Sequence, residues 1–428
     1  MRKQLVYTSR RFQSNNWTFQ KGKLSMQKLK DKATIDAKID QINLVFPDQF
    51  GRLTGLKLNA EYFIETIENS KRDNCTPFFE YKYNPFRFDV LGKPIDFKDT
   101  VQMPKSIRLT PDLDTMREQP WLQKQAVVMA NVHQPDSDEI IRYAPRNMLK
   151  QVLEQRQQDI FDECQNDQTQ PDQEVVVAQQ KLDKIKTQIL FSFVLHKYGK
   201  DDKEQHHNSN KGMLTLEQGW GDILEECRKH LRDIGIPIQS NDQTQVNNQF
   251  RFHLREVDGD LLGQCDMFHT AKHAMKYIGY QNQYDISTLP IDSSNNSNDL
   301  ILNIKGRNLH PSEFQNVLFF APNVNSVRRL RMRKNGDIFK QKGEQSYEVA
   351  ITAPDSNLYL AISSLLQTKA QTDKELVMPR NYQEAVTLFD QYKDQMDEQV
   401  YKYYKALFEH ELKELDENFN KWEVNRIY

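Results

Sequence analysis

Five cysteine and histidine side chains make the best case for metal binding in this chain. They are Cys227, His230, Cys265, His269 and His273. The last three are four residues apart, so a helix would carry them along one side, and thiolate and imidazole groups are common zinc ligands. The paired CxxC spacing of structural zinc sites is missing, and an apolar helix face gives Cys265 a place in a hydrophobic core. We therefore predict no metal, although the sequence leaves open whether these five residues bind one.

A run of basic residues is the second feature with defined chemistry. Between Ser326 and Lys342, seven lysines and arginines stand against one acid, Asp337. In a strand, alternate side chains share a face, so the arginines would form a row above a buried apolar row. Arginine suits phosphate, and such a row could hold an RNA backbone, whereas the alternative is an edge strand kept soluble by its charges. The predicted RNA-binding residues are Arg328, Arg329, Arg331, Arg333, Lys334, Lys340 and Lys342.

Short catalytic signatures are absent from the sequence. It has no GxxxxGK[ST], GxGxxG, HExxH or GxSxG motif, and His410-Glu411 lacks the second histidine of a zinc protease. Asp258-Gly259-Asp260 lacks the further oxygen ligands of a calcium loop. The sequence thus predicts no catalytic residue and no cofactor, and hence a protein that is not an enzyme.

Composition limits the class of protein. The 58 lysines and arginines nearly balance 60 aspartates and glutamates, so any case for nucleic-acid binding must be local. The four cysteines are scattered, which favours a reducing compartment. The longest apolar run, near Ile189 to Leu195, is far shorter than the roughly 18 to 20 residues of a membrane-spanning helix. We therefore expect no transmembrane segment.

The first 30 residues resemble a targeting segment. They contain eight lysines or arginines and no acid. A basic, acid-free start rich in serine and glutamine is typical of mitochondrial import, although an ordinary basic tail has the same composition. The predicted location is the mitochondrial matrix, and the sequence leaves open whether the segment is cleaved.

Periodicity and turn residues predict an α+β fold, a small α/β sandwich unit flanked by long helices and extended arms. Helical patterns cover Ser137 to Cys164, interrupted at Pro145, and about Glu174 to Tyr198, Gly219 to Ile234 and Asp260 to Tyr280. The sandwich unit would contain a strand over Asp299 to Lys305, a helix from Pro311, the basic strand, an Asn335-Gly336 turn, two return strands and a helix to Thr368. The expected regions are a tail (1–30), an extended arm with short elements (31–135), a mostly helical region or insertion (136–291), the α/β unit (299–370), and a long C-terminal helix or helical hairpin (380–425).

Two stretches together resemble the mitochondria-specific small-subunit ribosomal protein family usually numbered thirty-five. Met103 to Pro111 is similar to that family's apolar, Pro, apolar, Leu-Thr-Pro pattern, and Leu300 to Arg333 to its strand, short helix and basic strand. The residues between them would be an insertion. The resemblance implies a structural, RNA-binding component of a ribonucleoprotein that serves translation, in contact with ribosomal RNA and other mitochondrial ribosomal proteins, with no active site and no cofactor.

Other functions are compatible with the same features. One is a non-catalytic scaffold subunit of a mitochondrial inner-membrane complex, such as an ATP synthase or respiratory assembly. Another is a soluble enzyme that uses the cysteine and histidine cluster. Bound metal would favour the enzyme, and sensitivity of the assembly to RNA digestion would favour the ribosome.

Overall fold

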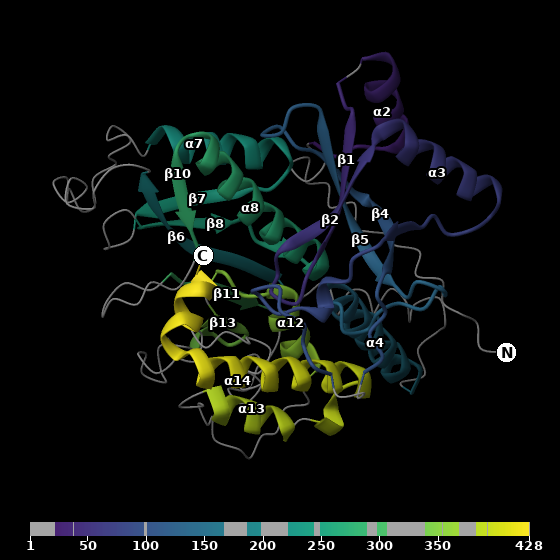
Figure 1. The fold of residues 1–428 in the computed structure, drawn as a ribbon. Coiled ribbons are helices and arrows are strands. Elements are labelled where there is room, and N and C mark those ends of the chain that lie inside the picture. Colours follow the sequence, from purple (N-terminus) through teal and green to yellow (C-terminus); the bar gives the residue numbers. More distant parts are fainter. Residues whose placement is uncertain are drawn as a thin grey trace.

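The computed structural model describes residues 22–36, 38–97, 101–166, 186–197, 221–243, 249–288, 298–305, 339–352, 354–367, 382–391 and 393–427. These residues combine helices with two β-sheets, one near the N-terminus and one in the middle of the chain (Figure 1). The prediction of an α+β protein is therefore confirmed at this level. No helix among the described residues is long and apolar enough to cross a membrane.

The first sheet has five strands in the order β2-β1-β5-β4-β3. Their bounds are Gln41–Pro47 (β1), Leu53–Asn59 (β2), Phe79–Tyr81 (β3), Ile107–Glu118 (β4) and Gln125–His133 (β5). Only the central pair β1 and β5 is parallel among these described strands. Helix α3 (Ala60–Arg72) begins at the Asn59 cap and buries one apolar face that includes Phe63 and Ile67, while α2 (Met26–Lys30) precedes the sheet.

The second sheet has eight strands and is built around β6. The main order is β12-β13-β11-β6-β8-β7, and β9 and β10 also pair with β6. The bounds are Lys186–Lys197 (β6), Ile238–Gln243 (β7), Gln249–Leu254 (β8), Val257–Asp258 (β9), Tyr284–Ser287 (β10), Leu300–Lys305 (β11), Phe339–Gly343 (β12) and Ser346–Thr352 (β13). All pairs among these strands are antiparallel.

Helices cover one face of the second sheet. Alternate residues of β6, namely Ile189, Phe191, Phe193 and Leu195, are buried in a core shared with these helices. The helices are α4 (Pro145–Asn166), α7 (Gly221–Asp233), α8 (Leu261–Gln281) and α12 (Leu358–Gln367). Helix α8 lies between the second sheet and strand β2 of the first, so residues on nearly all its sides are buried (Figure 1). The side chains on the other face of the sheet are mostly polar.

The C-terminal part is a helical hairpin. Helices α13 (Tyr382–Asp390) and α14 (Glu398–Ile427) meet through a hydrogen bond of 2.6 Å from the Tyr382 hydroxyl to Glu411. The Asp397 carboxylate accepts hydrogen bonds from backbone N–H groups at the start of α14. This cap marks the beginning of α14 as a helix separate from α13. The described residues of 380–425 thus form two main helices that contact each other. They pack against the first sheet's core, where the Tyr403 hydroxyl donates to the Phe86 carbonyl at 3.0 Å.

Several sequence expectations differ from this fold. Residues 31–135 do not form an arm, because their short elements pair with one another and make the first sheet. The helix predicted over 174–198 is wrong where it is described: Lys186–Lys197 is strand β6, and the rest lies outside the described residues. A short apolar run fits a buried strand or a buried helix, and pairing on both sides decides for the strand. Pro145 begins α4 and does not interrupt a longer helix.

The α/β unit expected over 299–370 does not stand alone. Strands β11 and β13 continue the sheet of β6, and α12 packs on α4 and α8. The helix expected from Pro311 and the Asn335-Gly336 turn lie outside the described residues. Helices near Gly219 to Ile234 and Asp260 to Tyr280 are confirmed as α7 and α8.

Candidate functional site

The face of the second sheet opposite the helices gathers charged and amide side chains. We call it the polar face and define it by Asp299 and residues from the four adjacent strands β11, β6, β8 and β7. These are Asn303, Lys305, Gln188, Ser192, Arg251, His253 and Asp242. In β8 the sequence Gln-Phe-Arg-Phe-His-Leu explains the division, because the apolar residues are buried in the core and Arg251 and His253 point the other way.

A row of four residues crosses the polar face at right angles to the strands. Ser192 pairs with Arg251, Arg251 pairs with Asp242, and the Ser192 backbone N–H donates to the Asp299 carbonyl at 2.9 Å. The guanidinium of Arg251 lies 3.9 Å from a carboxylate oxygen of Asp242 and 3.9 Å from one of Asp299. A cation thus stands between two anions on β8, the strand next to β7 at one end of the described strand order.

Arg251 has hydrogen-bonding capacity that the described residues do not use. Its side chain is 25% exposed, and its Nε–H is buried without a hydrogen-bond partner in the structure. Its two ion-pair contacts, at 3.9 Å, are longer than hydrogen bonds. A guanidinium carries five N–H donors in a planar fork, which fits a carboxylate or a phosphate. Arg251 can therefore donate to an incoming oxyanion.

Other groups on the polar face already have partners. Asn303 donates to Gln188 at 3.0 Å, and Gln188 donates to Gln239 at 2.9 Å, which links three strands. His253 Nε2 lies 2.9 Å from Asp242 Oδ1. Two lysines form ion pairs, Lys305 with Glu256 and Lys342 with Glu348, the latter at 3.3 Å.

The junction between the two sheets contains a second arginine, Arg146, in a different state. Its side chain is 1% exposed, and its Nε and Nη2 donate to the two oxygens of Asp266, each at 2.9 Å. Further donors reach Asn131 and Asp112, both at 2.7 Å. Burial alone would lower the pKa of Arg146, but the charge of Asp266 outweighs it and raises this pKa well above its usual value. The network ties α4 and α8 to β4 and β5.

His269 and Lys272 of α8 also lie at this junction. His269 Nδ1 donates to the Gly51 carbonyl at 2.8 Å, and its Nε2 accepts from the Leu358 N–H at 3.2 Å, which fixes a neutral tautomer. Burial, together with the charge of Lys272, holds the pKa of His269 well below its ordinary value. Burial also lowers the pKa of Lys272 to about 7. These groups join the loop after β1 to α8 and α12 and face the interior.

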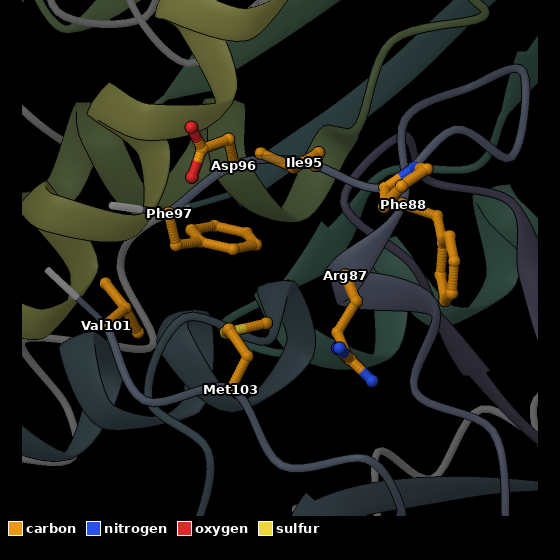
Figure 2. A pocket seen from close by; sticks show the side chains of 8 residues that line it. Arg87, Phe88, Ile95, Asp96, Phe97, Val101 and Met103 are labelled. Carbon is orange, nitrogen blue, oxygen red and sulfur yellow. The ribbon is translucent and has the colours of Figure 1, made fainter. Parts of the chain in front are cut away.

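A pocket of about 290 Å³ lies in the loop between β3 and β4 (Figure 2). Its lining consists of Arg87, Phe88, Pro94, Ile95, Asp96, Phe97, Val101 and Met103. Phe97 stacks on Tyr403 of α14, with ring centroids 5.5 Å apart, and the Asp96 carboxylate points away from the Phe97 ring in Figure 2. Arg87 and Asp96 are the charged residues of this lining, whereas the polar face gathers several charged and amide side chains, so the polar face is the stronger candidate.

The cysteine and histidine residues singled out in the sequence have other roles in the structure. Cys265 is in the hydrophobic core, as predicted, and so is Cys227, and burial raises the pKa of both thiols. His269 uses both ring nitrogens, and His230 Nε2 lies 3.6 Å from Glu226. In the described part of the chain, no three Cys, His, Asp or Glu residues come together as a metal site.

Most of the predicted RNA-binding residues lie in a part of the chain that the structure does not describe. Arg328, Arg329, Arg331, Arg333 and Lys334 lie outside the described residues. Lys340 is exposed on β12, and Lys342 forms the ion pair with Glu348. Sequence reasoning missed Arg251 and Asp242. The alternation of apolar and polar residues in β8 was the available signal. A single arginine on the polar side of a strand is not distinctive without the residues of the neighbouring strands.

Comparison with known proteins adds an independent finding. The chain matches no protein-family model. Over 226 residues, 51% of this chain, it is 25% identical to glutamate–isopropylamine ligase from a Pseudomonas species, and the match covers 44% of that ligase. The solved structure of GmaS without ligand has a TM-score of 0.64 at 16% identity, covering 92% of this chain and 99% of that one. A GmaS/ADP complex has a TM-score of 0.62 at 14% identity, covering 92% and 98%. The chain therefore has the fold of GmaS.

These similarities contradict the ribosomal interpretation. The chain resembles ligases, so the resemblance to the ribosomal protein family, the roles in a ribonucleoprotein and in translation, and ribosomal RNA and ribosomal proteins as partners are all wrong. The alternative scaffold role and the expectation of no enzyme fail for the same reason. The stretches that carried the resemblance contribute to β4 and β11, which belong to different sheets, and apolar strands beside turns recur in many folds. The mitochondrial matrix stays a prediction.

Proposed function

We propose that this protein is an ATP-dependent ligase that joins a carboxylate of glutamate to an amine and releases ADP and phosphate. The observation that carries the proposal is the 25% identity over 226 residues to glutamate–isopropylamine ligase. The fold similarity to GmaS, including its complex with ADP, supports it. Because the match spans less than half of that ligase, the substrates are part of the proposal.

The chemistry requires an activated carboxylate. An amine does not displace an oxygen from a free carboxylate, because oxide is a poor leaving group. Transfer of the terminal phosphoryl group of ATP to that oxygen turns it into part of a phosphate. The amine nitrogen then forms the C–N bond, the C–O bond breaks with release of phosphate, and the nitrogen loses its proton. The polar face supports this reaction because it combines a partly exposed arginine with a histidine and carboxylates.

Nucleotide chemistry usually involves Mg²⁺ held by carboxylates and phosphates. The described residues of the polar face do not fit such a site. Asp242 and Asp299 lie on either side of the Arg251 guanidinium, and Glu348 pairs with Lys342, so a cation of the chain already stands beside each of these carboxylates. We therefore assign no step to a metal. The residues named here can bind and orient anionic and cationic groups of a substrate.

A substrate-omission assay tests the proposal. The purified full chain is incubated with ATP, Mg²⁺, L-glutamate and isopropylamine, and ADP is measured together with the amide product by mass spectrometry. We expect ADP and amide in equal amounts, and neither when glutamate or the amine is left out. Ammonia and methylamine replace isopropylamine in parallel reactions to define the amine. ADP release that ignores glutamate, or no product with any of these amines, would overturn the proposal.

A further inference from the structure

We infer that Arg251 and Asp242 form a binding site for the zwitterionic end of an α-amino acid on the polar face. The guanidinium of Arg251 receives the carboxylate, and the Asp242 carboxylate receives the ammonium group. The inference rests on the proposed function only for the choice of glutamate as the ligand. The site itself follows from the ion pairs and the unused donors of the second sheet.

The first step of the argument is the state of the Arg251 side chain. It is three-quarters buried, its Nε–H has no hydrogen-bond partner in the structure, and its contacts to Asp242 and Asp299 are 3.9 Å long. Buried polar groups are normally hydrogen-bonded, and a charged donor without an acceptor costs free energy. Arg146 at the junction does not show this pattern, because all three of its nitrogens donate hydrogen bonds.

The second step is rigidity. Arg251 lies in the middle of β8, between Phe250 and Phe252, whose rings are in the hydrophobic core. Strand β8 is paired on both sides, with β6 and β7. The backbone beneath the guanidinium is therefore fixed, so little ordering is needed when a ligand binds.

The third step is the choice of ligand. The charges of Asp242, Arg251 and Asp299 alternate along the row, negative, positive, negative. A polyanion such as a nucleotide would gain from Arg251 but would be repelled by the two carboxylates beside it. An amino acid presents a carboxylate with an ammonium group two bonds away, which matches adjacent positive and negative groups. The Asp242 side chain is 49% exposed and can be reached by such a ligand.

Binding to the full chain is measured by isothermal titration calorimetry with L-glutamate, with glutarate, which lacks the ammonium group, and with ADP. We expect Arg251→Gln to weaken glutamate binding by about tenfold to a hundredfold, the usual loss for a charge-assisted hydrogen bond. Asp242→Asn should weaken binding of glutamate but leave that of glutarate within about twofold. Arg228→Gln is the matched control, because this arginine forms an exposed ion pair with Glu225 on α7, outside the polar face. It should leave glutamate binding unchanged.

The outcomes separate this inference from the proposed function. Glutamate binding that is unchanged in Arg251→Gln, or a variant that loses only ADP binding, overturns the amino-acid site even if the ligase reaction occurs. Glutamate binding that depends on Arg251 and Asp242 supports the site even if no amide is formed. If Arg251→Gln does not fold, as judged by circular dichroism, Asp242→Asn with glutamate and glutarate still decides, because it leaves Arg251 in place.

Discussion

Arg146 at the junction and Arg251 on the polar face are both largely buried, yet they differ in what surrounds them. Arg146 donates to Asp266, Asp112 and Asn131 at hydrogen-bond distances. Arg251 has two carboxylates at 3.9 Å and a buried donor without a partner among the described residues. An arginine whose N–H donors are hydrogen-bonded within the protein joins elements of the fold. An arginine with an unpaired donor can instead bind a ligand. The difference distinguishes the structural region from the candidate site better than the number of charges does.

The largest effect is expected from Arg146→Ala. Removal of this side chain leaves Asp266 and Asp112 without their cation in the interior. Loss of one partner from a buried ion pair typically costs about 3–5 kcal/mol of unfolding free energy. Urea denaturation measures it, with Arg228→Ala as control, since Arg228 forms an exposed pair with Glu225 on α7 and should cost less than about 0.5 kcal/mol. Equal stability of the two variants would contradict the structural role of Arg146.

Gly51→Ala should have the next largest effect. Gly51 has φ +75°, and a Cβ there would lie 2.7 Å from His269 Cε1. We expect a loss of about 1–3 kcal/mol from backbone strain and the clash. Gly92→Ala is the matched control, because Gly92 has φ +80° with nothing within 4 Å, so it reports the strain alone. If both variants lose the same free energy in urea denaturation, the tight contact between the first sheet and α8 does not exist.

Lys272 predicts a dependence of stability on pH. Its pKa in the folded protein is about 7, against about 10.5 when unfolded. Between these values the unfolded chain binds more protons, so this residue makes stability rise with pH, by at most about 1.4 kcal/mol per pH unit. Urea denaturation from pH 7 to 9 should therefore show a steeper rise in wild type than in Lys272→Met. Parallel curves would mean that Lys272 is not desolvated at the junction.

The smallest effect on stability is expected from Arg251→Gln. Its ion pairs are long, and the Asp242 side chain is 49% exposed, so the pairs should contribute less than about 1 kcal/mol. The same denaturation experiment measures the change. A loss as large as that of Arg146→Ala would remove the distinction between the two arginines and give Arg251 a structural role.

The sequence predicts helices α7 and α8 correctly but does not predict the polar face as a site. The apolar faces of α7 and α8 repeat over more than three turns, which makes helices recognisable. An apolar run such as that of β6 fits a buried helix as well as a buried strand, and its partners β8 and β11 are more than 50 residues away in sequence. Arg251, Asp242 and Asp299 come from separate segments, so only the register of the sheet brings them together. The charges of the basic run near Arg331 are adjacent in sequence, so this run is visible without the fold.

Hydrogen exchange monitored by mass spectrometry is the most direct test that the polar face binds the substrates. Amide exchange of the full chain is compared with and without ADP and L-glutamate. We expect slower exchange in peptides from Ile238–Gln243 and Gln249–Leu254, which carry Asp242 and Arg251, and no change in peptides from Arg87 to Met103 at the pocket between β3 and β4. Protection confined to the pocket, or none in either region, would contradict the assignment of the polar face as the functional site.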